Sequence, residues 1–190
     1  KETVTGITAV VDATRSGVLT VEMGGDVINR APGEILGIGE VAGVLIALVV
    51  LVMTLGSLVA AGLPIIVAIV TILAGMGALF GLSQIVDITA TTPVLAVMLG
   101  LAVGIDYSLF IINKYRHYLL QGYAYNEAIG KAIATAGNAV LFAAATVVIA
   151  LSALTIVQIP FMSTMGLAGA GTVALAALVA VTLLPALLGV

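Results

Sequence analysis

The stretch Gly100-Leu-Ala-Val-Gly-Ile-Asp-Tyr-Ser-Leu-Phe110 carries Asp106, the one charged side chain that lies within any apolar span of this sequence. A carboxylate inside a membrane is energetically costly, so it needs a proton, water or a polar partner, and it is a functional candidate by default. Burial favours its neutral form, whereas a nearby donor or water favours the anion. A carboxyl group held between these influences is suited to load a proton on one side and release it on the other. We therefore predict that Asp106, with Tyr107 beside it, forms a proton relay.

The composition is that of an integral membrane protein. Of the 190 residues, 62% are hydrophobic and 8% are charged, whereas soluble domains average about 25% charged. No Asp, Glu, Lys or Arg occurs within residues 41–86, 88–105 or 132–190. These charge-free ranges predict an all-α polytopic membrane protein, and the net charge of −3 indicates no nucleic-acid partner.

The sequence shows no signature of an enzyme. It contains no cysteine, which excludes thiolate metal sites, and it has no phosphate-binding loop, metal-ligand cluster or nucleophile triad. We therefore expect no catalytic residue, no metal, no cofactor and no ATP hydrolysis within this chain. A secondary active transporter fits these observations better than an enzyme.

The N-terminal part, residues 1–33, differs from the rest. Apolar positions in Ile7–Arg15 predict a short amphipathic helix, and the alternation in Gly17–Met23 predicts a strand. One helix and one strand cannot bury a core alone. We interpret this part as a short αβ remnant, the C-terminal end of an extracytoplasmic domain, and the chain, which opens without Met, as a fragment of something larger.

Residues 34–190 are predicted to form a transmembrane domain. Glu34 to Glu40 is expected to lead into the first span, and Gly62-Leu-Pro64 to break the chain between the first two spans. The third span is expected to continue as helix to Gln121, since Gly122 is the first stop signal. The five expected spans are about 38–61, 63–86, 93–113, 134–157 and 163–188.

Basic residues set the predicted orientation. The loop 114–131 carries Lys114, Arg116 and Lys131 against Glu127, so it is expected to be cytoplasmic. Five spans then place residues 1–40 outside and the C-terminus inside the inner membrane. Four tyrosines of this region suit an aromatic belt at the interface: Tyr115, Tyr118, Tyr123 and Tyr125.

The span around Asp106 is expected to have two unlike sides. At about 100° per residue, one side carries Asp106 together with Ala102, Leu109, Phe110 and Asn113. The opposite side is a ridge of small residues suited to close helix packing, formed by Gly100, Gly104 and Ser108. Lys114 lies eight residues beyond Asp106, or about 12 Å along the helix axis, so the carboxylate is deep in the span.

Three further polar residues are candidates for a path to the relay: Asn113, Asn138 and Thr146. For Asn138 and Thr146, hydrogen bonds between helices are the stronger alternative. The same alternative, a purely structural hydrogen bond, stays open for Asp106 and Tyr107.

The motif Gly104-Ile-Asp-Tyr107, followed by Phe110 and Lys114-Tyr-Arg116, resembles the mycobacterial membrane protein large (MMPL) family of resistance-nodulation-division (RND) transporters. The resemblance extends over essentially the whole chain. Its other matching pieces are Glu40, Gly56-Ser57, Gly62-Leu-Pro64, Ala128-Ile129, Gly137-Asn-Ala-Val140, Met165-Gly166 and Thr182-Leu-Leu-Pro-Ala-Leu-Leu188.

This resemblance implies the second to sixth helices of one transporter half, preceded by the end of its porter domain. It implies proton-driven export of lipids, glycolipids or siderophores across an actinobacterial inner membrane. Asp106 and Tyr107 match the family's Asp–Tyr relay pair, which meets an equivalent pair from the second half. Accessory envelope proteins or a homo-oligomer are further possible partners. Two departures are Lys114, where the family more often has Arg, and Phe142-Ala-Ala-Ala-Thr146, which lacks a small hydroxyl often found there.

Two other functions are compatible with the same sequence. One is an RND-type drug-efflux protein or protein-translocation accessory, which uses a similar membrane half. The other is a non-transporting membrane module that senses lipid or scaffolds a complex, with Asp106 purely structural.

Overall fold

The computed structural model describes residues 2–14, 38–84, 88–89 and 91–189. The chain divides into two units, Lys1–Ile35 and Leu36–Val190. In the first unit, α1 (Glu2–Thr14) contains most of the expected amphipathic helix and begins five residues earlier. The expected strand Gly17–Met23 lies outside the described residues, so the αβ character of this part stays a prediction.

The described residues of the second unit form helices joined by short turns. Its helices are α2 (Ile38–Leu55), α3 (Leu58–Leu82), α4 (Thr91–Leu120), α5 (Tyr125–Ala132), α6 (Asn138–Ser152) and α7 (Pro160–Leu188). A π-helical segment, η1 (Ile133–Gly137), joins α5 to α6, and a 3₁₀ turn, η2 (Ala153–Val157), follows α6.

Within the described part of the chain, four helices are long and apolar enough to cross a membrane. They are α3, α4, the run Tyr125–Val157 that includes α6, and α7. Helix α2 contributes the shorter apolar stretch Val41–Leu55. The prediction of an all-α multi-pass membrane protein is confirmed, whereas the count of five spans stays a prediction.

The expected break at Gly62-Leu-Pro64 is wrong. The chain turns instead at Gly56, whose backbone has φ +66° and whose N–H donates to the carbonyl of Val52 at 2.8 Å. Ser57 then caps α3 by accepting the N–H of Ala60 at 3.5 Å. A left-handed glycine followed by a serine N-cap is a complete stop-and-start signal. Pro64 lies buried inside α3, where it lacks the N–H bond to the preceding turn and its ring crowds the carbonyl of residue 60.

Helix α4 ends one residue before the expected Gln121. Gly122 has φ +89°, its N–H donates to the carbonyl of Leu119 at 3.0 Å, and the N–H of Tyr123 donates to that of Tyr118 at 3.3 Å. This pair of bonds is a Schellman cap. The Tyr118 and Tyr123 rings meet edge to face, with 5.8 Å between their centroids. This pair supplies the apolar contact that accompanies such caps.

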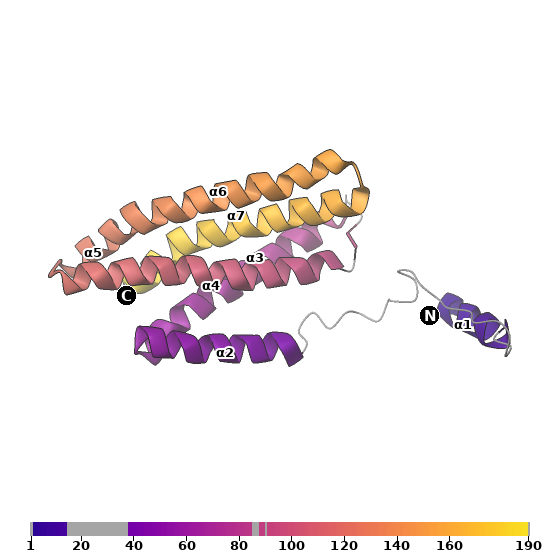
Figure 1. Ribbon diagram of the computed structural model, residues 1–190, viewed down its shortest axis with the longest axis horizontal. Helices are drawn as coiled ribbons and strands as arrows, with labels where there is room; N and C mark the ends of the chain where they lie inside the picture. The colour runs from indigo at the N-terminus through magenta and orange to yellow at the C-terminus, as the bar shows by residue number, and fades with distance from the viewer. Residues whose placement is uncertain (1, 15–37, 85–87, 90, 190) are drawn as a thin grey trace. The chain divides into compact units, whose positions relative to one another are not determined.

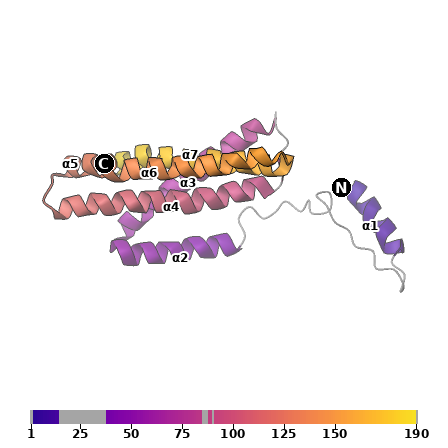
Figure 2. The same ribbon diagram turned by 45° about the horizontal axis from the view of Figure 1, so that its top comes forward.

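Helix α7 is the centre of the packing. It contacts α3, α4 and α6, and α6 and α7 lie side by side while α3 crosses obliquely (Figures 1 and 2). Small buried residues allow these close approaches. The tightest is at Gly166, where an added Cβ would lie 2.5 Å from the carbonyl oxygen of Leu151 and 2.9 Å from the Cβ of Leu154.

We predict that Gly166→Ala destabilises the protein by about 1–3 kcal/mol, because its methyl group overlaps backbone that cannot rotate away. The matched control is Gly171→Ala on the same helix, where an added Cβ has no neighbour within 4 Å. That control should be neutral or slightly stabilising, since alanine favours a helix over glycine. Thermal unfolding of both variants in detergent is the measurement, and equal midpoints would contradict this packing.

Candidate functional site

One side of α4 is packed through its small residues. Gly100, Gly104 and Ser108 are all buried. A Cβ added at Gly104 would lie 3.0 Å from the Cα of Ala68 in α3. One added at Gly100 would lie 3.3 Å from side chains of both α3 and α7. The backbones of α3 and α4 therefore approach closely where Gly104 meets Ala68.

The hydroxyl of Ser108, one of these three small residues, is satisfied within its own helix. Ser108 is fully buried, and its Oγ donates to the carbonyl oxygen of Gly104 at 2.7 Å. Such an internal bond removes the cost of burying a polar group. Ser108 thus acts here as a small packing residue rather than as a donor to a neighbouring helix.

The opposite side of α4 carries Asp106 and is uncovered on this chain. Ala102, Asp106, Phe110 and Asn113 are exposed. Among the described residues, no ion pair or hydrogen bond involves the Asp106 carboxylate. The carboxylate therefore faces outward from the helices that the structure describes, available to a partner outside them.

Tyr107 has a different environment from its neighbour. It is half-buried and packs against the apolar core of the unit. The two residues thus point in different directions, as about 100° of helical rotation requires. Asp106 is directed away from α3 and α7, whereas Tyr107 lies at the edge of the packed side.

The structure does not join the expected polar path to Asp106. Asn138 and Thr146 belong to α6, whose main partner is α7, and both side chains are exposed. Asn138 Nδ2 donates to the carbonyl of Ala134 and Thr146 Oγ1 to that of Ala143, each at 2.7 Å. Neither contacts another helix through these bonds. Asn113 lies on the Asp106 side of α4, about 10 Å further along its axis.

The end of α4 beyond Asn113 is an aromatic and basic cluster. Tyr115 meets Tyr125 edge to face at 5.7 Å, and Lys131 Nζ lies 4.5 Å above the centre of the Tyr123 ring. Lys131 is also 3.9 Å from Glu127. Amphipathic rings beside basic groups suit a membrane interface. The four tyrosines predicted as a belt are gathered at this one end of the unit.

The π-helical segment η1 was not predicted from the sequence. It contacts α4, and the hydroxyl of Tyr118 in α4 donates to Thr135 Oγ1 at 3.5 Å. Thr135 Oγ1 in turn donates to the carbonyl of Lys131 at 2.8 Å. Single π turns within long helices often mark functional positions. The local sequence Ile-Ala-Thr-Ala-Gly offers no signal that distinguishes this turn from ordinary helix.

The sequence matches the MMPL family over residues 1–190. It is 48% identical over 176 residues to membrane protein YdfJ of Bacillus subtilis (strain 168), covering 90% of this chain and 24% of that protein. It is 36% identical over 143 residues to the mycolic acid-containing lipids exporter MmpL11 of Mycolicibacterium smegmatis, covering 75% of this chain and 15% of that protein.

A third relative is the trehalose monomycolate exporter MmpL3 of Mycobacterium tuberculosis. It is 30% identical over 151 residues, which cover 80% of this chain and 16% of the exporter. The chain therefore spans about a quarter or less of the length of each of these relatives.

We predict that Gly104→Ala destabilises the unit by about 1–3 kcal/mol, because the added methyl presses on the backbone of Ala68. Ala68→Gly should partly restore stability in the double variant, since it removes a Cβ that would lie 3.3 Å from the new methyl. Contacting pairs show coupling energies of about 0.5–3 kcal/mol.

The measurement is a double-mutant cycle by thermal unfolding. Gly77→Ala combined with Ala68→Gly is the control, because a Cβ at Gly77 has no neighbour within 4 Å. Purely additive effects in the Gly104 cycle would mean that α3 and α4 do not meet at this point.

Proposed function

Because this chain belongs to the MMPL family, we propose that it is part of one half of a transporter that uses the proton-motive force to export lipid or glycolipid across the inner membrane. The part comprises the end of the porter domain and the second to sixth membrane helices of that half. In this proposal Asp106 and Tyr107 form the proton relay. The observation that carries it is the position of Asp106: a lone carboxylate in the apolar part of a spanning helix, on the side opposite the packed ridge.

The free-energy cost of placing the Asp106 carboxylate in the apolar part of a helix supports the proton relay over a purely structural role. Asp106 has no ion-pair partner among the described residues, and a carboxylate left against hydrocarbon costs about 3 kcal/mol or more. A structural residue would be expected to find its hydrogen bonds within the helices around it, as Ser108 does. Asp106 instead faces out of this unit, where a second half with its own Asp–Tyr pair or a water-filled path is required to stabilise the charge.

A titrating carboxyl at this depth can drive a conformational cycle. Its neutral form is compatible with an apolar environment and its anion requires water or a donor, so gain and loss of the proton favour different arrangements of α4. Moving one charge through 100 mV is worth about 2.3 kcal/mol. That energy is large enough to bias an equilibrium between inward- and outward-open states.

The names of two relatives support lipid as the cargo, since one is called a mycolic acid-containing lipids exporter and the other a trehalose monomycolate exporter. The chain covers only a small part of either protein, so the cargo proposal applies to the whole transporter. Asn113 lies on the same side of α4 as Asp106 and is the remaining candidate for a polar step toward the cytoplasm. Asn138 and Thr146 are better explained by their bonds to the backbone one turn earlier, at Ala134 in η1 and at Ala143 in α6.

We predict that Asp106→Asn abolishes lipid transport driven by a pH gradient in proteoliposomes of the full-length protein, because the amide cannot titrate. Asp106→Glu should keep part of the activity, since it keeps an acid. Ser108→Ala is the matched control on the same helix, because its hydroxyl bonds only to its own backbone. Transport by Asp106→Asn at the wild-type rate would refute the relay, and loss of folded protein without a selective transport defect would favour the structural alternative.

We predict further that Gln121 faces the cytoplasm and Ser83 the outside, because basic loops are retained on the cytoplasmic side. Both side chains are exposed, and α4 is the helix between them. Single cysteines at these two positions, on a cysteine-free background, should react with an impermeant maleimide from opposite sides. Reversed labelling would refute the orientation, and labelling from one side would show that α4 does not cross.

A further inference from the structure

The run Tyr125–Val157, which comprises α5, η1, α6 and η2, is one continuous helical segment with two different partners. Helix α5 contacts α4 and helix α6 contacts α7, whereas η1 lies between them and contacts both α4 and α7. Figure 1 shows α5 beside one end of α4 and α6 alongside α7. A single helical segment must therefore direct its buried side first toward one neighbour and then toward another.

The buried side of this segment has an unusual spacing. Five of its buried residues recur at every fourth position, and they are Ala128, Ala132, Ala136, Val140 and Ala144. An α-helix has about 3.6 residues per turn, so each step of four residues advances about 40° past a full turn. Over the four steps the series would drift by about 160°. An unbroken α-helix would thus carry the first and the last of these residues on nearly opposite sides.

The π turn removes most of this drift. A π turn is one residue longer than an α turn, so η1 takes up about 100°, which is the rotation of one residue in an α-helix. The remaining drift is about 60°, which is within the width of an ordinary buried helix stripe. The turn Ile133–Gly137 lies in the middle of the series, between Ala132 and Val140. Its position allows α5 and α6 to bury the same series of small residues.

Side chains bond to the backbone at this turn. A π turn shifts the backbone hydrogen bonds by one residue and leaves one carbonyl without its usual N–H donor. Asn138 Nδ2 donates to the carbonyl of Ala134, inside η1, at 2.7 Å. Thr135 Oγ1 donates to the carbonyl of Lys131 at 2.8 Å and accepts the hydroxyl of Tyr118 at 3.5 Å. Because an unpaired carbonyl is costly in a membrane segment, the Asn138 amide stabilises the turn.

We propose that Asn138 is a positioning residue that holds η1 in the π register, and that this register sets the rotation of α6 on α7 relative to that of α5 on α4. If the turn reverted to α-helix at unchanged length, every residue of α6 would rotate by about 100°. Ala139 and Ala143, which are exposed, would then take the places of Val140 and Ala144. This inference does not depend on the proton relay or on the transported cargo.

The test removes the extra residue. Deletion of Ala134 from the full-length protein should convert the segment to an unbroken α-helix without changing the rotation of α6, since one residue and about 100° are removed together. We expect the midpoint of thermal unfolding in detergent to stay close to that of the wild type. Asn138→Ala should lower the midpoint by several degrees in the full-length protein. The same substitution should have no effect in the deletion variant, where no π turn remains to be held.

Each change has a matched control on α6. Thr146→Val is the control for the substitution, because Thr146 Oγ1 donates in a similar way to the carbonyl of Ala143 at 2.7 Å, but within regular α-helix. Its effect should be the same with and without Ala134. Deletion of Ala143 is the control for the deletion, because it rotates the rest of α6 where no extra residue can be absorbed. That variant should lose its folded state.

Electron cryo-microscopy of the variant that lacks Ala134 reads the register directly. Val140 and Ala144 should still be buried against α7 in an unbroken α-helix. A rotated α6, or an equal effect of Asn138→Ala with and without Ala134, would overturn the proposal. So would a loss of folding on deletion of Ala134 as complete as that on deletion of Ala143. The deletion variant decides the matter even if Asn138→Ala does not fold.

Discussion

The contact between the backbones of α3 and α4 at Gly104 and Ala68 decides how this unit is arranged. With no side chain at Gly104, the two helices meet at a distance where an added Cβ would lie 3.0 Å from a main-chain atom. Because a helix is rigid, packing one side of α4 against α3 also sets the direction in which its opposite side points. Close packing through Gly100, Gly104 and Ser108 thus turns Asp106 away from α3 and α7, and the proposed relay follows from that rotation.

The polar groups inside the bundle follow a second constraint, which is that hydrocarbon offers no hydrogen bonds. Ser108, Thr71 and Thr172 are buried, and each donates to a carbonyl of its own helix. No buried side-chain polar atom among the described residues is left without a partner. Asp106 differs from these groups because it is exposed, and no described residue forms an ion pair or a hydrogen bond with its carboxylate. In the proposed function its partner comes from outside the described helices.

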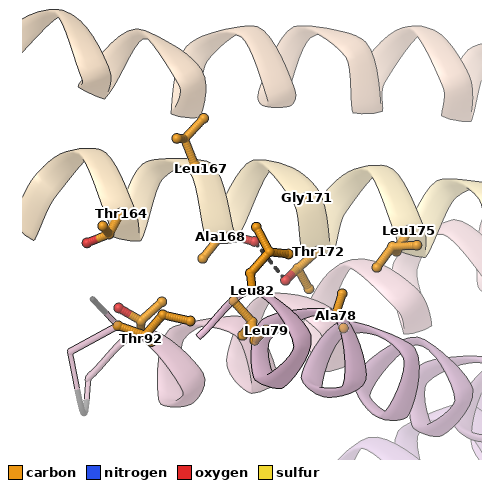
Figure 3. Close-up of a pocket in the computed structure, with 12 residues that line it drawn as sticks. Ala78, Leu79, Leu82, Thr92, Thr164, Leu167, Ala168, Gly171, Thr172 and Leu175 are labelled. Atoms are coloured by element: carbon orange, nitrogen blue, oxygen red, sulfur yellow. Dashed lines mark hydrogen bonds between the residues drawn. The ribbon is translucent and has the colours of Figure 1, made fainter. Parts of the chain in front are cut away.

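Asp106 and a hollow of about 170 Å³ between α3, α4 and α7 (Figure 3) lie at different points along α4. Asp106 is at the middle of the helix and faces outward, whereas the hollow lies at its beginning, between α3 and α7. They are connected by the packed side of α4, since Gly100 meets Thr172 there.

The sequence by itself determined the class of protein and the two unlike sides of α4, because charge, hydrophobicity and helical periodicity are local properties. It misplaced the turn between α2 and α3. The sequence does contain a signal for the turn between α2 and α3, which is Gly56 followed by the capping residue Ser57. The proline at position 64 was the more conspicuous signal, and it led to the wrong position for the turn. The tertiary structure alone decided that Asn138 and Thr146 bond to the backbone one turn earlier, that five residues before α6 form a π turn, and that a hollow opens where three helices diverge. These features depend on which helices meet and at what angle, and a pattern along one chain does not contain that information.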